Sequence, residues 1–157
     1  MGGTHPAIVT RMFMAASLVM PLLFVNACDG RKEQLDAEVR RLCEIDGGIK
    51  VYEVVELSPD NFDQYGLINF YNPSKGEEAL GEEYIFKSDV HYYARGNPEM
   101  WRYQYQIIRR SDQKILSESI SYSRKGGDLP GPWHDSSFGC PDERGDIPLI
   151  KQTFVRF

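Results

Sequence analysis

The sequence has no excess of basic residues: 18 Lys and Arg stand against 23 Asp and Glu, which gives a formal net charge of −5. A chain of that charge repels phosphate unless a strong local basic patch opposes it, so we expect no nucleic-acid partner. Heptad repeats are also missing, which excludes a coiled coil. With 157 residues, 41% of them apolar and 12% aromatic, the composition is instead typical of one globular domain.

Short motifs that mark common catalytic and cofactor sites are missing as well. The pair Gly126-Gly127 is followed by Asp128 rather than by the Gly-Lys-Ser/Thr of a phosphate-binding loop. No serine lies in a Gly-x-Ser-x-Gly context, and His91 and His134 do not have the spacing of metal ligands. The sequence therefore predicts no metal, no cofactor and no catalytic residue, which favours a protein that is not an enzyme.

A hydrophobic run long enough to span a membrane is the third absence. The longest apolar stretch, Met12 to Val25, has fourteen residues and reaches about 21 Å as a helix, short of the ~30 Å hydrocarbon core. Residues 1–27 contain no Asp or Glu, and Arg11 is their single Lys or Arg. A weakly positive start followed by a short apolar run is typical of a signal peptide rather than of a transmembrane helix.

The apolar run ends at Val25-Asn26-Ala27-Cys28, which resembles the lipobox of bacterial lipoproteins. The resemblance implies that the signal peptide, residues 1–27, is removed. It also implies that Cys28 carries lipid, including palmitate, and that this lipid anchors the single domain of residues 28–157 to the cell envelope. Asp29 resembles the retention signal of inner-membrane lipoproteins and so favours that membrane, with the domain facing the periplasm. The alternative is a buried or anchoring hydrophobic helix with an incidental cysteine.

Two cysteines, Cys43 and Cys140, remain once Cys28 is assigned to lipid, and the implied compartment is oxidising. Such a pair most simply forms a disulfide, and the chain-entropy model gives roughly 4–5 kcal/mol for closing so long a loop. The competing interpretation makes Cys140 a nucleophile with His134 as its base. The stretches around the two cysteines, CEIDGGIKVYE and GPWHDSSFGCP, also resemble a family of proteobacterial lipoproteins without an assigned activity, which implies that the two segments pair.

The rest of the chain predicts an α+β fold: one N-terminal helix packed on an antiparallel sheet of about five strands, held by one disulfide. Leu35, Val39, Leu42 and Cys43 share one face of a helix over residues 31–46, and glycine follows it. Apolar and polar residues then alternate as they do in strands. The expected strands cover residues 49–57, 83–94, 100–110, 115–124 and 147–157. We expect one sheet face against the helix and the other toward water.

Two long segments, 58–81 and 125–146, connect these elements, and each is long enough to be functional. The second holds Trp133, His134 and Asp135 on a glycine-rich loop, a composition suited to contacting a ligand. In the alternative, Trp133 fills the edge of the core and the disulfide holds the loop in place.

An aromatic row is the other candidate surface. Trp101, Tyr103 and Tyr105 alternate on one face of an expected strand. Such a row stacks on bases or sugars in some proteins, but at alternate strand positions it is more typical of a hydrophobic core.

These observations favour a lipid-anchored envelope protein that binds a protein partner, as an inhibitory or accessory module, without catalysis. The alternative is an envelope hydrolase or small-ligand-binding protein that uses the Trp133-His134-Asp135 loop. A structural envelope component is the third hypothesis, which an exposed apolar patch or sheet edge would indicate.

The lipid anchor predicts that metabolic labelling with a radioactive fatty acid marks the wild-type chain and not Cys28→Ala, because the acyl chains are bound through that sulfur. Cys43→Ala is the control, since it removes a cysteine that carries no lipid and should keep the label. Equal labelling of the wild type and Cys28→Ala would contradict the anchor.

Overall fold

The computed structural model describes residues 30–129, 131–132 and 134–157, so the expected signal peptide, Cys28 and Trp133 lie outside the described residues. Residues 30–46 form a helix. The strands that follow are β1 (Gly48–Val51), β2 (Val55–Leu57), β3 (Tyr84–Ala94), β4 (Glu99–Arg109), β5 (Lys114–Lys125), β6 (Ser137–Cys140) and β7 (Phe154–Arg156). Helix α2 (Asp146–Thr153) precedes β7, and two short 3₁₀ segments, Pro59–Asn61 and Pro73–Glu78, lie between β2 and β3.

Five strands form the main sheet, and all of its pairings are antiparallel. The order is β1-β5-β4-β3, with β6 also paired to β5. β1 and β6 share one edge of β5, because β1 pairs with its first half and β6 with residues Tyr122 to Lys125. A second, small sheet pairs β2 with β7 in parallel. The prediction of an α+β fold, with one helix on an antiparallel sheet of about five strands, is therefore confirmed.

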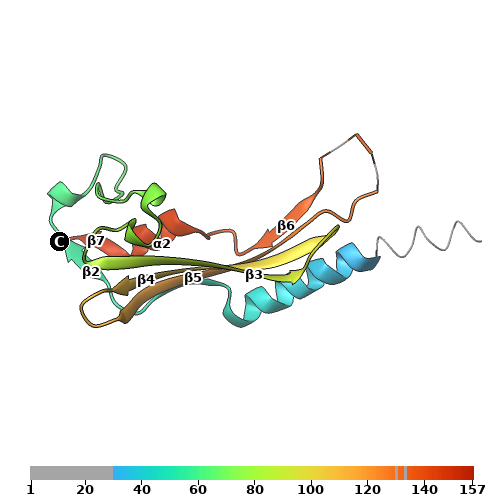
Figure 1. Ribbon diagram of the computed structural model, residues 1–157, viewed down its shortest axis with the longest axis horizontal. Helices are drawn as coiled ribbons and strands as arrows, with labels where there is room; N and C mark the ends of the chain where they lie inside the picture. Colours follow the sequence, from blue (N-terminus) through green and yellow to red (C-terminus); the bar gives the residue numbers. More distant parts are fainter. Residues whose placement is uncertain (1–29, 130, 133) are drawn as a thin grey trace, which may run out of the picture.

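The two faces of the main sheet are covered at opposite ends. The N-terminal helix lies on one face, which we call the helix face, where Val39 packs against Met100, Ile120 and Tyr122. On the other face, which we call the α2 face, α2 and the segment 58–81 pack over the other end. Figure 1 shows the helix below the right half of the sheet and α2 above its left half. The expectation that one whole face meets water is wrong, because each face is covered over one half.

The N-terminal helix buries the stripe that its sequence predicts. Val39 is fully buried, and Leu42 and Cys43 pack in the same cluster. Cys43 forms a disulfide with Cys140 of β6, 97 positions later, which confirms the predicted bridge. The competing interpretation of Cys140 as a nucleophile is wrong, since its sulfur is bonded. Gly47 follows the helix where a side chain has no room, because a Cβ there would lie 2.7 Å from the sulfur of Cys43.

A buried guanidinium joins the helix to the far end of β5. Arg124 is 2% exposed and donates two hydrogen bonds to the Asp36 carboxylate, at 2.7 and 2.9 Å. Its third nitrogen donates to the carbonyl and hydroxyl oxygens of Ser136. Ser136 in turn donates to Asp128, whose carboxylate pairs with Lys32, one turn before Asp36. These contacts among five residues begin and end on the N-terminal helix, and we call them the charge ring.

The charge ring depends on an ionised Asp128. Hydrogen bonds from Lys32 and Ser136 lower the pKa of Asp128 to about 2. Because the pKa of an unfolded aspartate is about 4, these contacts stabilise the fold above that pH and are lost as the pH falls toward 2.

The expected strand 49–57 is broken into β1 and β2. The break has a local cause: the backbone N–H groups of Tyr52 and Glu53 both donate to the carbonyl of Leu116, which turns the chain away from the main sheet. The chain then pairs with β7 as β2. Strand β6, in contrast, lies inside the segment 125–146 that the sequence predicts as a loop, because the edge of β5 beyond β1 is open to it.

The expected last strand, 147–157, is mostly the helix α2, with only β7 extended. Leu149, Ile150 and Thr153 are its buried residues, on one side of the helix. Pro148 lies in the first turn of α2, where a missing N–H costs no helical hydrogen bond. The hydroxyl groups of Thr153 and Ser117 lie 2.6 Å apart, which fixes α2 on β5.

Arg124→Met should lower the free energy of unfolding by about 3 kcal/mol or more, because it leaves the mostly buried Asp36 carboxylate without its partner. Urea-induced unfolding of the purified protein measures the change. Arg41→Met is the matched control, since it breaks an exposed pair with Glu38 on the same helix and should have a much smaller effect. Equal effects of the two substitutions would contradict the role given to Arg124.

Candidate functional site

The predicted ligand-contacting loop shows no convergent site in the part of the chain that the structure describes. His134 and Asp135 are both exposed, and neither has a hydrogen-bond partner among the described residues. Trp133 lies outside the described residues, so its role stays a prediction. A hydrolase that used this loop would need a further polar group beside His134 and Asp135, and no hydrogen bond brings one to them.

The described residues contain neither a candidate metal cluster nor a helix able to cross a membrane. They hold no group of three or more His, Cys, Asp or Glu side chains that could bind an ion. The His91 ring packs edge-on against Tyr93, with their centroids 4.9 Å apart. None of the described helices combines the length and the apolar character needed to cross a bilayer.

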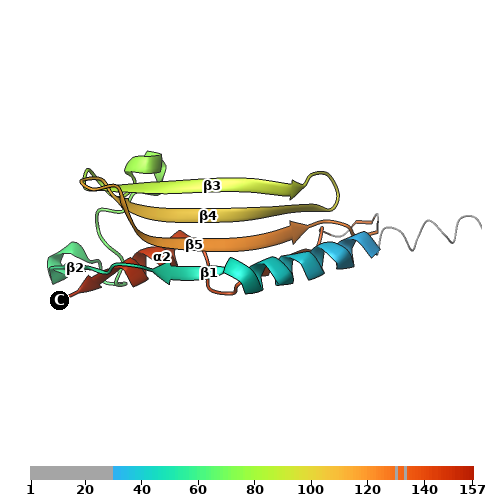
Figure 2. The same cartoon turned by 90° about the horizontal axis from the view of Figure 1, so that it is seen from below.

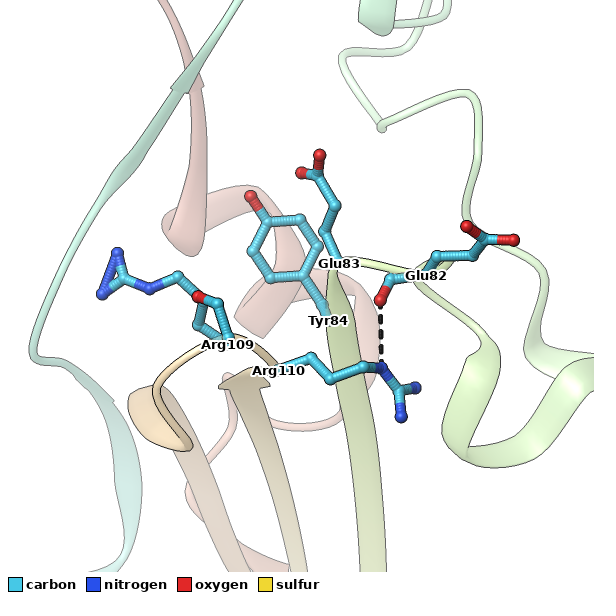
Figure 3. A pocket seen from close by; sticks show the side chains of 6 residues that line it. Glu82, Glu83, Tyr84, Arg109 and Arg110 are labelled. Atoms are coloured by element: carbon cyan, nitrogen blue, oxygen red, sulfur yellow. Dashed lines mark hydrogen bonds between the residues drawn. The ribbon is translucent and has the colours of Figure 1, made fainter.

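A cavity of about 410 Å³ lies where β3 begins and β4 ends. Its walls include Glu82, Glu83, Tyr84, Arg109 and Arg110 (Figure 3). The two arginines point away from each other, and both are already paired. Arg109 forms an ion pair with Glu53, and Arg110 donates to the Glu82 carbonyl at 3.0 Å. The charged groups of this cavity therefore do not converge on a ligand.

The α2 face carries a row of aromatic side chains beside a row of serines. Each aromatic residue of β4 stands directly opposite a serine of β5. The pairs are Trp101 with Ser123, Tyr103 with Ser121, and Tyr105 with Ser119. On the other side of β4, the neighbouring strand β3 adds Val90 and Tyr92 to the same face. Because serine side chains are short, space remains beside the larger rings.

Two hollows follow this row, and they share Tyr105. The first, of about 220 Å³, is lined by Trp101, Tyr103, Tyr105, Ser121, Ser123, Arg144 and Gly145. The second, of about 480 Å³, is lined by residues that include Tyr105, Phe86, Asp146 and part of the 3₁₀ segment Pro73–Glu78. We call the two hollows, with their floor of Trp101, Tyr103 and Tyr105, the aromatic groove.

One half of the aromatic groove is open to solvent. Tyr103 keeps 36% of its surface exposed, and beside it on β3 Tyr92 and Val90 keep 37% and 39%. Figure 1 shows why: α2 lies over the other end of the sheet, and no described helix covers this half of the α2 face. The interpretation of the aromatic row as core therefore holds for Tyr105, which packs against the buried cluster, and fails for Tyr103.

The floor of the groove is fixed to the core. The rings of Phe86 and Tyr105 stack with centroids 5.6 Å apart, and Tyr105 and Tyr103 are parallel at 6.1 Å. In the wall, Tyr71 donates a hydrogen bond to Asp146, the first residue of α2. Burial raises the pKa of Tyr71 far above its usual range, with a further contribution from this hydrogen bond, and burial also raises the pKa of Tyr105. Both phenols therefore stay neutral at physiological pH.

A donor in the groove is without a partner. The indole N–H of Trp101 is shielded from solvent and has no hydrogen bond to any described residue. A buried indole N–H usually has an acceptor, and leaving such a group unpaired costs about 1–3 kcal/mol. Arg144 lines the same hollow and uses one nitrogen on the Pro141 carbonyl. The groove thus combines aromatic rings with hydrogen-bond donors, which suits a partner that brings carbonyl or carboxylate oxygens.

The open half of the helix face has a different character. Its side chains are mostly charged or amide groups, namely Lys50, Lys87, Asp89, Gln104, Gln106 and Glu118. Several of them are paired with each other or with neighbours: Glu118 accepts hydrogen bonds from Tyr52 and Gln104. An exposed row of aromatic rings is therefore a feature of the α2 face.

No family model matches the chain, and neither does any curated protein or solved structure. The candidate site therefore depends on the geometry of this molecule alone. The sequence contains part of the signal, since aromatic residues alternate over 100–110 and serines over 115–124. It does not show that α2 covers only one end of the resulting face.

Trp101→Phe should change the free energy of unfolding by less than about 1 kcal/mol, because the loss of ring area is offset by removal of an unpaired N–H. Met100→Ala is the control: Met100 is adjacent in sequence but fully buried on the helix face, and its truncation should cost about 2–5 kcal/mol in urea-induced unfolding. A loss of that size for Trp101→Phe would mean that the indole is needed for the fold rather than for binding.

Proposed function

We propose that this chain is a lipid-anchored, extracytoplasmic binding protein, without catalytic activity, that holds a protein partner in the aromatic groove. The observation that carries the proposal is the open half of that groove, where the exposed ring of Tyr103 stands on a stacked aromatic floor. Sheet faces of this kind normally pack against another layer, so an aromatic half left open indicates a surface used for contact with another molecule.

The residue types of the groove support a protein partner. Tyrosine, tryptophan and arginine are enriched at interfaces, and Trp, Tyr and Arg supply most of the strongest contacts. The aromatic groove combines these three types, since Arg144 lines the first hollow together with Trp101 and Tyr103. Beside the groove on β3, the guanidinium of Arg95 lies 4.0 Å from the ring centroid of Tyr92. Because Tyr103 stacks on Tyr105, little ordering is needed when a partner binds.

The position of the expected anchor supports a partner at the membrane. Cys28 precedes the described residues by two positions, so at most about 7 Å of chain separates a lipidated Cys28 from residue 30. Figure 2 shows the start of the N-terminal helix at the same end of the molecule as the turn between β3 and β4. The open half of the groove lies toward that end, since Tyr92 and Trp101 flank the turn. The proposal therefore favours a partner that is itself attached to the membrane.

A photo-crosslinking amino acid in place of Tyr103 tests this proposal in cells that express the full chain. We expect illumination to join the chain to one discrete protein, because Tyr103 lies in the open half of the groove. The control is the same amino acid in place of Tyr65, which is 75% exposed but lies in the segment between β2 and β3. Trp101→Ala should weaken the product formed at position 103.

Three outcomes would contradict the proposal. Equal products at positions 103 and 65 would mean that the groove has no special role. Absence of any protein product at position 103 would favour a small ligand or a structural role. An unchanged yield of the crosslinked product at position 103 with Trp101→Ala would mean that the partner does not contact the groove.

A further inference from the structure

The outer edge of β3 is unpaired among the described residues. β3 is the last strand of the main sheet, and no described strand pairs with its outer edge. The seven residues from Lys87 to Tyr93 are all exposed, whereas Tyr84 and Phe86, before them, are buried. Figure 2 shows β3 along the upper margin of the sheet, with a short helical segment near its left end. An exposed strand edge of this length is a template for another strand.

We propose that this edge pairs with the same edge of a second copy of the chain, antiparallel and centred on Val90. Strands related by a two-fold axis perpendicular to the sheet keep their faces, so paired residues share a face and one residue lies opposite its own copy. Val90 is the midpoint of the exposed segment. Pairing about Val90 therefore uses all seven residues on each strand.

Charge complementarity favours this register. With Val90 on the axis, Asp89 of one copy lies opposite His91 of the other, and the pair occurs twice. Both residues lie on the helix face, where an imidazole N–H can donate to a carboxylate across the strands. Moving the axis by one residue brings two Asp89 carboxylates or two His91 rings opposite each other and shortens the overlap. Asp89 and His91 thus disfavour other registers of edge pairing and favour the register centred on Val90.

The same arrangement also brings side chains of the α2 face into contact across the two copies. Val90 of each copy meets Val90 of the other, and Tyr92 lies opposite Ser88. A single strand pair buries less than the ~800 Å² per partner of a typical stable interface. We therefore expect the dimer to form where the chain is concentrated, as a lipid anchor would concentrate it on a membrane. Because the two-fold axis preserves the faces, both N-terminal helices lie on one side of the joined sheet.

Cysteine crosslinking of the full chain in membranes tests the pairing. Val90→Cys places two thiols opposite each other across the axis, so mild oxidation should give a disulfide-linked dimer on a non-reducing gel. Ile115→Cys is the matched control, because Ile115 has the same exposed fraction as Val90, 39%, but lies at the start of β5. The wild-type chain gives the background yield of disulfide-linked dimer that its own cysteines produce.

Charge variants in the Val90→Cys background test the register. Asp89→Lys should lower the dimer yield by about tenfold, since the two carboxylates that accept hydrogen bonds from the His91 imidazoles across the strands are lost. The exchange Asp89→His with His91→Asp should restore it, because the opposite pairs are reformed. Arg144→Ala, which changes the wall of the aromatic groove away from β3, should leave it unchanged, and this result separates the β3 edge from the groove. A dimer yield no higher than that of Ile115→Cys, or one unaffected by Asp89→Lys, would overturn the proposal.

Discussion

The buried ion pair between Arg124 and Asp36 is the contact on which the rest of the arrangement depends. It joins the end of β5 to the helix. Hydrogen bonds from Arg124 to Ser136 and from Ser136 to Asp128, and an ion pair between Asp128 and Lys32, link the same strand to the helix a second time. A guanidinium that is 2% exposed is tolerated only when its hydrogen bonds are satisfied, so helix, strand and loop must meet together. The Cys43–Cys140 disulfide ties the other end of the helix to β6. Between them, these two links hold the helix on one half of one sheet face.

The open groove follows from that placement. With the helix and β6 fixed at the end that holds Met100 and Tyr122, the second core forms over the other end and on the other face, under α2. The α2 face is then uncovered where Trp101 and Tyr103 stand beside serines. Tyr103 stacks on Tyr105, which in turn stacks on Phe86, and the Trp101 ring contacts Tyr92. In the proposed function, stability and binding are thus separated in space: the helix face of this end holds the fold, and the α2 face of the same end contacts a partner.

The sequence predicts those elements whose periodicity extends over many residues. The helix over residues 31–46, the three long strands and the disulfide were all predictable, since each depends on a regular apolar pattern or on the count of cysteines. The C-terminal segment was not, because IPLIKQTFVRF alternates like a strand while Leu149, Ile150 and Thr153 also lie on one side of a helix. β6 is too short to have a pattern of its own and forms because β5 offers a free edge. The groove depends on which half of a face α2 covers, a tertiary property that no local pattern contains.

In the proposed function, another protein in the cell envelope occupies the open half of the aromatic groove. Hydroxyl-radical footprinting of the full chain, first purified and then in intact envelopes, tests it most directly. We expect Tyr103 to be oxidised in the purified protein and protected in the envelope, while Tyr65 is oxidised equally in both. Equal oxidation of Tyr103 in the two states would contradict the account.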